Sequence, residues 1–437
     1  MSDKSASERR IHVPILTRVE GEGALNIVLS QDTIERVELN IYEPPRFFEA
    51  FLRGRSHNEV ADITARICGI CPIAYQMTAI QAIETAWGIE IPENIYRLRR
   101  LMYFAEWIES HGLHIHLLHA PDFFDCESGL ELAKLNPTAV QRGLKLKKIG
   151  NQVLEVLGGR AIHPINLAVG GFYRLPRRED LEALIPLFEW GLEAAAEMTR
   201  WIGTFPFPEF HSPTTYVALQ DEREYAIMTG RIACSDGKRY EVGEFENQFY
   251  EEHVPHSTAL HARRINDAEP YQVGPLARVH LNFDRLTETA KRLASEANWC
   301  LPSYNPYHSI MARALELVHA FEEGLSILRS LDTSGNARVS YCTSAASGCS
   351  ITEAPRGLIY HRYDLDQDGN VDCAKIVPPT SQNQRQIEQD LFRALPALIP
   401  LPDQEVARCC ERLIRNYDPC ISCATHFLKV RRTFTGA

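Results

Sequence analysis

"DPCISCATH", residues 418–426, places two cysteines and a histidine close to the end of a chain of 437 residues. Its cysteines, Cys420 and Cys423, have the C-x-x-C spacing. Only one other pair has this spacing, Cys68 and Cys71 in "RICGIC". Two such pairs supply four soft thiolates, which are ligands suited to zinc, copper(I) and iron. Whether the fold brings these four side chains together is therefore the first question that the sequence raises.

Spacing alone leaves three uses of these thiols open. Structural zinc sites often use four cysteines, but zinc ribbons separate the two pairs by about 15–20 residues. Here residues 72–419 intervene, which is 348 residues (419 − 72 + 1). A redox pair needs a β-α-β setting that is not evident, and c-type haem attachment needs a histidine directly after the second cysteine, where Ala424 stands. A structural metal site, a catalytic metal site and redox thiols all remain open.

Composition limits the class of protein. The chain is 45% apolar and 24% charged, which suits one large or two ordinary domains with a sizeable core. Its net charge of −11 argues against nucleic acid or an anionic membrane as the main partner. No run of 18 apolar residues occurs, so no membrane span is expected. The N-terminal stretch lacks the apolar segment of an export signal, so a cytoplasmic location is predicted.

Hydrophobic periodicity predicts a mainly α chain with α+β elements. Residues 11–42 alternate apolar and polar side chains as strands do, and from about residue 56 apolar side chains recur at helical intervals. We expect β segments at the N-terminus and before the C-terminal helices. One large domain is predicted over residues 1–426, with β-rich (11–45), helical (56–202), mixed (204–280), helical (281–331), β-rich (338–378) and C-terminal helical (384–426) parts.

The sequence around the two cysteine pairs resembles the two signature motifs of the large, catalytic subunit of NiFe hydrogenases. Other matches follow in the order of that family, from about residue 11 to 426. They are "LTRVEGEGAL" (16–25), "RFFEAFLRGR" (46–55), "SHGLHIHLLHAPDFF" (110–124), "GGRAIHPINLAVGG" (158–171), "EAPRG" (353–357) and "VPPTSQN" (377–383). The resemblance implies the multihelical hydrogenase large-subunit fold, which is related to the quinone-proximal subunit of respiratory complex I.

The chemistry implied by this resemblance is the reversible heterolytic cleavage of H2 at a nickel–iron centre. Cys68 and Cys420 would be terminal nickel ligands, while Cys71 and Cys423 would bridge nickel and iron. The iron would carry carbon monoxide and cyanide. Cys420 would accept the proton, and Glu20 in "RVEGEG" would relay it onward. Judged on its local sequence only, Glu20 is a solvated turn residue.

Further residues follow from the resemblance. Arg356 would lie over the open metal position and contact a cyanide, in an orienting and electrostatic role because a guanidinium stays protonated. Asp122 and Asp418 would hold it, although an aspartate beside proline is commonly a helix cap. Thr380 is a candidate hydrogen-bond donor to the other cyanide.

A magnesium site is also implied. Glu49 and His426 resemble ligands of Mg2+, which prefers oxygen donors and water, and the main-chain carbonyl of Lys375 is a further candidate. Taken alone, Glu49 is an exposed helix charge.

Two features imitate other metal sites. "DLDQDGNVD" (364–372) is similar to a calcium loop, but position 12 is Lys375 and no helix pair flanks it, so a hairpin turn is predicted. The histidines of the apolar stretch 110–124 are expected to be hydrogen-bonded core residues rather than zinc ligands. They are His111, His114, His116 and His119.

Two departures point to one branch of the family. Tyr75 stands where many members have histidine, and Pro379 stands where some have a hydroxyl residue. Both are similar to the cytoplasmic branch that couples H2 to NAD(P) or a deazaflavin. They put the hydrogen bonding around iron in question and leave the metal ligands unaffected.

Electrons must leave through other chains. The remaining cysteines show no cluster-binding arrangement, and no G-x-G-x-x-G nucleotide fingerprint occurs. The expected partners are therefore a small iron–sulfur subunit, together with flavin-containing NAD(P) reductase subunits. Nickel-insertion proteins and a maturation protease are also implied, the protease removing residues 427–437 after His426. The alternatives are a non-catalytic relative of the complex I subunit, which lacks the four cysteines, and a zinc-stabilised binding protein.

Overall fold

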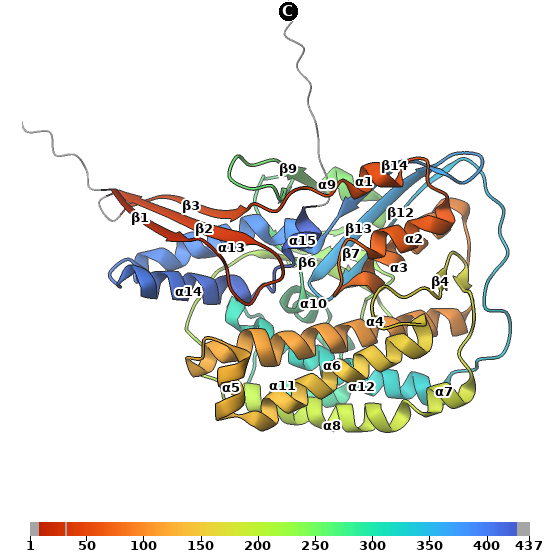
Figure 1. The fold of residues 1–437 in the computed structure, drawn as a ribbon, viewed down its shortest axis with the longest axis horizontal. Helices are drawn as coiled ribbons and strands as arrows, with labels where there is room; N and C mark the ends of the chain where they lie inside the picture. Colours follow the sequence, from red (N-terminus) through yellow and green to blue (C-terminus); the bar gives the residue numbers. More distant parts are fainter. Residues whose placement is uncertain (1–7, 31–32, 426–437) are drawn as a thin grey trace, which may run out of the picture.

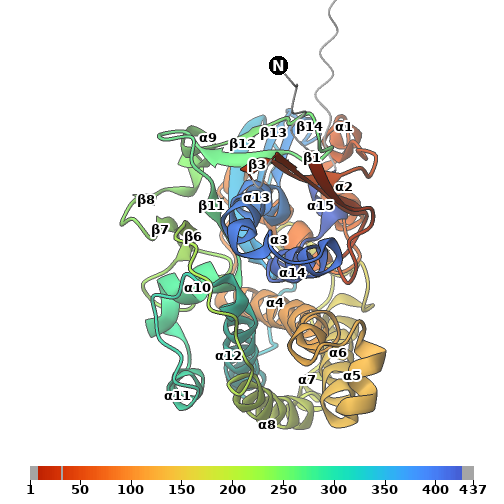
Figure 2. The same cartoon turned by 90° about the vertical axis from the view of Figure 1, so that its left-hand side faces the viewer.

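The structure, a computed structural model, describes residues 8–30 and 33–425. The chain begins with a three-stranded antiparallel sheet in the order β1 (Glu8–Val13), β2 (Gly23–Ser30) and β3 (Thr33–Ile41). Its apolar side chains form one core with the last two long helices, α13 (Pro379–Leu398) and α14 (Asp403–Arg415). Figures 1 and 2 show this sheet lying along these helices, so the two ends of the chain share one layer.

Long helices form the other main layer (Figure 1). They are α4 (Glu93–Leu113), α6 (Pro137–Gly158), α8 (Ile185–Ile202) and α12 (Ser309–Ser330). Glycines let α6 approach α4 and the π-helix that follows it (His114–His119) closely. A Cβ atom added at Gly150 would lie 2.6 Å from the Ala105 carbonyl oxygen, and one at Gly143 would lie 2.5 Å from the His116 Cβ. Larger residues would therefore push the helices apart.

A second antiparallel sheet connects the layers. Its strands are β12 (Ala346–Ala354), β13 (Gly357–Leu365) and β14 (Val371–Val377), in that order, and α3 (Pro72–Trp87) packs against it. Asp366 caps the turn between β13 and β14 by accepting hydrogen bonds from the backbone N–H groups of Asp368 and Asn370. The hairpin predicted for the calcium-like stretch is thus confirmed.

The region before this sheet is mixed. A four-stranded sheet has the order β11 (Tyr271–Gln272), β6 (Thr215–Gln220), β7 (Arg231–Cys234) and β8 (Arg239–Tyr240), and a separate hairpin joins β9 (Phe249–Glu252) to β10 (His261–Arg264). The shorter elements are β4 (Leu167–Ala168), β5 (Gly171–Phe172), α1 (Phe48–Leu52), α2 (His57–Ala65), α5 (Gly129–Leu135), α7 (Arg178–Glu182), α9 (Phe245–Gln248), α10 (Pro275–Asn282), α11 (Glu288–Glu296) and α15 (Ile421–Ala424). The predicted class, mainly helical with strands at the N-terminus and before the C-terminal helices, is confirmed.

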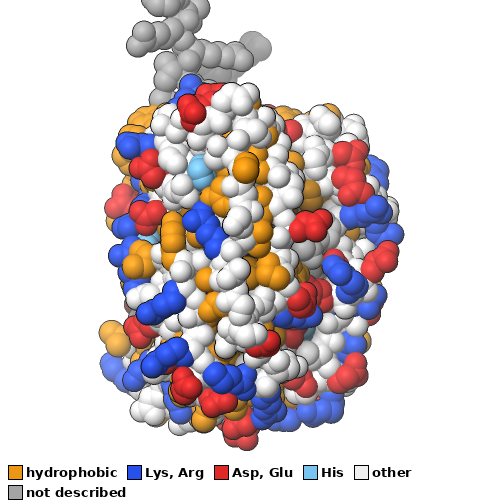
Figure 3. Space-filling view, turned by 90° about the vertical axis from the view of Figure 1, so that its right-hand side faces the viewer, with side chains coloured by type: hydrophobic (Ala, Val, Ile, Leu, Met, Phe, Trp, Pro, Cys, Tyr) orange, Lys and Arg blue, Asp and Glu red, His pale blue; other side chains and the backbone are white. Residues whose placement is uncertain are grey.

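One face of the molecule carries a broken strip of hydrophobic side chains between mixed charges (Figure 3). The segment around β4 and β5, on the right in Figure 1, contributes three exposed apolar side chains, Ile162, Ile165 and Tyr173, each more than half exposed. Among the described residues no helix has the length and apolar character to span a membrane.

Candidate metal centre

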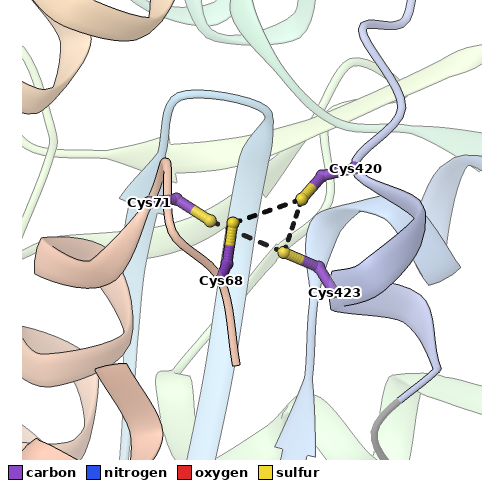
Figure 4. Close-up of side chains that lie close together, drawn as sticks. All are labelled: Cys68, Cys71, Cys420 and Cys423. Carbon is purple, nitrogen blue, oxygen red and sulfur yellow. Dashed lines mark hydrogen bonds between the residues drawn. The ribbon is translucent and has the colours of Figure 1, made fainter. Parts of the chain in front are cut away.

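Four cysteine sulfurs meet inside the molecule. Cys68 lies in the loop after α2, Cys71 directly precedes α3, Cys420 directly precedes α15, and Cys423 lies within α15. The Sγ atoms of Cys68 and Cys420 are 3.4 Å apart, those of Cys71 and Cys423 are 3.5 Å apart, and those of Cys420 and Cys423 are 2.8 Å apart. Figure 4 shows the side chains converging from the two segments.

None of these four cysteines forms a disulfide, and each is at most 4% exposed. Their sulfur–sulfur distances exceed the roughly 2.05 Å of a disulfide bond. All four sulfur atoms lie within 4.8 Å of one another, a spacing that suits soft metals bound by thiolates at about 2.3 Å. The donor set therefore fits a nickel–iron group, with all four protein ligands coming from sulfur.

The thiols have perturbed acidities. Burial raises the pKa of Cys71, Cys420 and Cys423. At Cys68 burial acts in the same direction, but hydrogen bonds from Cys420 and the other two thiols outweigh it and lower the pKa. A bound cation stabilises thiolates directly, so metal binding would deprotonate the set.

Arg46 ties the two cysteine segments together. Its guanidinium donates to the Ile67 carbonyl at 2.6 Å and also to the Ser422 carbonyl, which places one side chain beside both pairs. Its backbone N–H donates to the Thr425 carbonyl at 2.8 Å. Sequence reasoning missed this residue, although it begins the quoted block 46–55.

Glu20 lies against Cys420. The thiol donates to the Glu20 Oε2 atom at 3.1 Å, and the backbone N–H of Ser422 donates to the same oxygen at 3.1 Å. Ile421 donates its N–H to the Glu20 carbonyl at 3.0 Å. Gly21 has φ +88°, and a Cβ there would lie 2.6 Å from the Ile421 side chain, so glycine permits this close approach.

Arg356 and Asp418 form a buried ion pair beside the cysteines. Their Nη2 and Oδ2 atoms are 2.9 Å apart, and Arg356 Nε donates to the Asp418 carbonyl at 2.6 Å. Burial alone would lower the pKa of Arg356, but Asp418 and the cysteines outweigh it and raise the pKa well above its usual value. The guanidinium thus keeps its charge.

Asp122 has different partners from those expected. It forms a bidentate ion pair with Arg415, with both contacts at 2.8 Å, and a second pair with Arg18 at 2.5 Å. These cations lower its pKa despite burial. The expectation that Asp122 holds Arg356 is therefore wrong, because two nearer arginines use its carboxylate. The Asp122 carboxylate instead links Arg18, just before Glu20, to Arg415, just before Cys420.

Two further residues touch the cysteine segments. The Thr380 hydroxyl accepts a hydrogen bond from the Cys420 N–H at 3.1 Å, and its own proton remains a donor. Tyr75 is 1% exposed, and burial together with Cys423 and Cys71 raises its pKa well above the usual value. A neutral tyrosine thus lies close to the thiols.

The expected magnesium ligands are only partly described. Glu49 Oε1 accepts a hydrogen bond from the Ile376 N–H at 2.8 Å, so its carboxylate lies beside the Lys375–Ile376 peptide. The Lys375 ammonium pairs with Glu251 at 2.6 Å. His426 lies outside the described residues.

The histidine-rich helix meets a buried network of charges. His111 contacts Glu316 at 2.9 Å, His114 contacts the Arg415 carbonyl at 2.9 Å and His116 contacts the Gly112 carbonyl at 2.9 Å, which confirms these three as hydrogen-bonded core residues. The chain adopts a π-helix over His114–His119, a distortion common at functional sites. No motif in the sequence pointed to Glu316.

Comparison with known proteins assigns this chain to a family. The family model described as nickel-dependent hydrogenase matches residues 46–143 and 238–426, more than half of the chain. The chain belongs to the nickel-dependent hydrogenase family. It is 32% identical over 436 residues to the alpha chain of sulfhydrogenase 1 from Pyrococcus furiosus, covering 97% of this chain and 100% of the relative.

Other hydrogenases are also similar to this chain, in sequence and in structure. One chain of the F420-non-reducing hydrogenase vhu from Methanocaldococcus jannaschii is 30% identical, over 88% of this chain and 98% of its own length. A crystal structure of an NAD+-reducing NiFe hydrogenase in the H2-reduced state superposes with a TM-score of 0.85 at 26% identity, covering 97% of this chain and 100% of that one. The protein is the catalytic subunit of a hydrogenase, so the complex I-like and zinc-binding alternatives are set aside.

Proposed function

We propose that Cys68, Cys71, Cys420 and Cys423 hold the nickel–iron centre of this hydrogenase, with Cys68 and Cys420 on nickel only and the other two bridging to iron. The convergence of four buried sulfurs is the observation that supports this most strongly. When bound, the centre supplies the Lewis-acidic metal that polarises H2. The residues around it would then accept the proton and balance the local charge.

Cys420 and Glu20 form the proposed first step of proton transfer. The thiol-to-carboxylate distance of 3.1 Å is within hydrogen-bond reach for sulfur, so a proton held on Cys420 Sγ can pass to Glu20 Oε2. The Ser422 N–H on the same oxygen fixes the orientation of the carboxylate. The Glu20 turn would then deliver the proton away from the metals.

Arg356 supplies positive charge without acting as a base in this proposal. Asp418 orients it through two contacts, and the anionic thiolates would hold its charge toward the centre. Thr380, fixed by Cys420, is a suitable donor for a cyanide on iron. We extend the proposal to carbon monoxide and cyanide as iron ligands and to Mg2+ at Glu49, the Lys375 carbonyl and His426.

Electron transfer would use partner chains. Several relatives are named as subunits, and the apolar strip in Figure 3 suits a protein partner, for which a small iron–sulfur subunit is proposed. The likeness to an NAD+-reducing enzyme supports coupling to NAD(P). We propose a flavin-containing reductase subunit and a cytoplasmic location as parts of the same hypothesis. The relative from Methanocaldococcus is named as non-reducing toward F420, so deazaflavin coupling receives no support from it.

Processing belongs to the same proposal. Residues 1–426 would form the mature catalytic domain after nickel-insertion proteins load the site and a protease removes residues 427–437. Intact mass measurement of active enzyme tests this step. A mass that includes Ala437 in the active fraction would contradict it.

Metal analysis combined with infrared spectroscopy tests the main assignment. The purified complex should contain one nickel per catalytic chain and show infrared bands of metal-bound carbon monoxide and cyanide. Zinc in place of nickel, with no such bands, would refute the nickel–iron assignment. A Cys126→Ala variant, which removes a buried cysteine outside the cluster, should keep both signals.

A further inference from the structure

A second group of metal-ligating side chains lies away from the cysteines. His256 follows β9, His261 begins β10, and Glu388 belongs to α13. One possible ligand atom from each residue lies within 4.8 Å of those of the other two. His256 Nε2 is 2.7 Å from Glu388 Oε1, and His261 Nδ1 is 3.7 Å from Glu388 Oε2. The two imidazole rings are nearly perpendicular, with centroids 5.5 Å apart.

His261 is the unusual member of this group. Its side chain is fully buried, yet neither ring nitrogen has a hydrogen-bond partner among the described residues. A buried polar group without a partner costs free energy, so its retention requires an explanation.

Glu388 is held in position by other groups. The Leu39 N–H donates to its Oε1 atom at 3.0 Å, and Arg385 donates to its Oε2 atom at 3.0 Å. The loop that carries His256 is also fixed, because Thr258 donates to the Ile41 carbonyl at 2.9 Å. Such supporting contacts orient metal ligands and reduce the cost of assembling a site.

His256 and Glu388 line a surface pocket of about 520 Å3, so an ion can enter from solvent. The charged residues of this pocket are three arginines and four glutamates, a formal balance of −1 (3 − 4). They are Arg36, Arg263, Arg385, Glu35, Glu38, Glu269 and Glu388. Arg263 is paired with Glu252 outside this set at 2.5 Å, which reduces its repulsion of a cation.

We propose that His256, His261 and Glu388 form a binding site for a divalent transition metal, with Zn2+ as its expected occupant. Two imidazoles and one carboxylate are a common protein ligand set for zinc, and they leave a fourth position for water. Ligands around a tetrahedral zinc ion are about 3.4 Å apart, which lies between the two distances measured to Glu388. Hard cations such as Mg2+ prefer all-oxygen sites, so the two imidazoles favour the softer ion.

The site would join three parts of the molecule. Glu388 also receives the N–H of Leu39 in β3, so one ion would connect the N-terminal sheet, the β9–β10 hairpin and α13. None of its residues contacts the four cysteines in the contacts described above. The inference is therefore independent of the proposed nickel–iron chemistry.

Zinc binding to the purified complex tests the site directly. The complex is stripped of loosely bound metal, dialysed against ZnCl2 and measured for zinc and nickel by mass spectrometry. Crystals then locate the zinc by anomalous scattering at its absorption edge. We expect one additional zinc per catalytic chain at these three residues, with nickel content and H2 uptake unchanged.

Substitutions separate this site from adventitious binding. Glu388→Gln and His261→Asn keep side-chain size and should weaken zinc binding at least about tenfold. The controls Glu269→Gln, in the same pocket, and His211→Ala, a histidine outside the group, should bind zinc as the native chain does. Retained nickel and H2 uptake report correct folding, and Glu388→Gln alone decides if His261→Asn fails to fold. Equal zinc binding by the native and Glu388→Gln proteins, or an anomalous peak elsewhere, would overturn the proposal.

Discussion

Two buried polar regions lie side by side in this protein and differ in how their charge is balanced. In one, Arg278 binds both oxygens of Glu316 at 2.6 and 2.8 Å and one oxygen of Glu353 at 3.1 Å. His111 and Tyr225 also form hydrogen bonds with the Glu316 carboxylate. Despite burial, Arg278 lowers the pKa of Glu316 to about 2, so the pair stays ionised. This region contains its own countercharges.

The cysteine region has the opposite character. Four thiols converge there, and burial raises the pKa of three of them because a thiolate in that position has too little positive charge around it. Arg356 is a cation beside the thiols, and Asp418 already pairs with it. A cation from outside the chain is needed to make four thiolates stable. The Arg278–Glu316 region thus balances its charge within the chain, whereas the four cysteines need a bound metal cation to balance theirs.

The two regions meet at two segments, residues 354–356 and 416–418. Arg278 donates to the carbonyls of Ala354 and Pro355 at 2.8 and 3.1 Å, directly before Arg356. Ser309 and Arg313 donate to the Asn416 carbonyl at 2.7 and 3.1 Å, close to Asp418. The scaffold network therefore sets the position of the ion pair that faces the cysteines.

Removing one thiol should have the largest effect. In Cys420→Ala the site loses both a metal ligand and the proposed proton acceptor, so H2 uptake should fall below detection and nickel content should drop. Uptake by gas-phase mass spectrometry and nickel analysis measure the two effects. Cys410→Ala, a buried cysteine in α14, should retain activity. H2 uptake by Cys420→Ala at the native rate would show that the four cysteines do not hold the cofactor.

Glu20→Gln should come next. It preserves size but removes the proton-accepting carboxylate 3.1 Å from Cys420, and general acid–base groups contribute about 10²- to 10⁴-fold. H2 uptake should fall by that range while nickel and the infrared bands stay unchanged. Exchange of D2 with solvent protons should fall in parallel. Glu22→Gln, an exposed neighbour, serves as the control, and equal losses in both variants would exclude a specific relay.

Arg278→Met tests the stabilising role of the Arg278–Glu316 ion pair. It leaves Glu316 buried without its main countercharge, which typically costs about 3–5 kcal/mol of unfolding free energy. Chemical denaturation measures the loss, and the double variant Arg278→Met/Glu316→Gln should recover part of it. Arg285→Met, more than one-third exposed, should change stability little. A stable Arg278→Met protein would show that the network is not the scaffold we describe.

The smallest expected effect is a pH dependence. Burial raises the pKa of Glu353 from its usual 4.5 to about 7. The folded protein then binds a proton that the unfolded chain releases, so the stabilisation present below about pH 4.5 is lost as the pH rises through about 7. Glu353→Gln should remove this contribution, on the order of 1–3 kcal/mol. Unfolding free energies at pH 5 and 8 measure it, and an unchanged pH slope would contradict the assignment.

The sequence predicted the cofactor region far better than the scaffold. Cys68, Cys420, Glu20 and Arg356 lie in short motifs that resemble those of a known family, so the resemblance indicated them without knowledge of distant contacts. Arg278 and Glu316 carry no motif, and their partnership exists only because α10 and α12 pack together. Asp122 shows the same limit. Its place in a motif was recognised, but which of several arginines it binds depends on tertiary geometry.

The bridge between Glu20 and Cys420 has a consequence for how the enzyme is made. A ribosome releases the N-terminal turn early and the second cysteine pair 400 residues later (420 − 20). The segment that carries Cys420 and Cys423 is therefore synthesised long after the Glu20 turn that it contacts. It supplies two of the four clustered thiols and places the Cys420 thiol against the Glu20 carboxylate. If the proposed function holds, a chain whose C-terminal cysteines have not docked would lack both the complete metal site and the proton relay from Cys420 to Glu20.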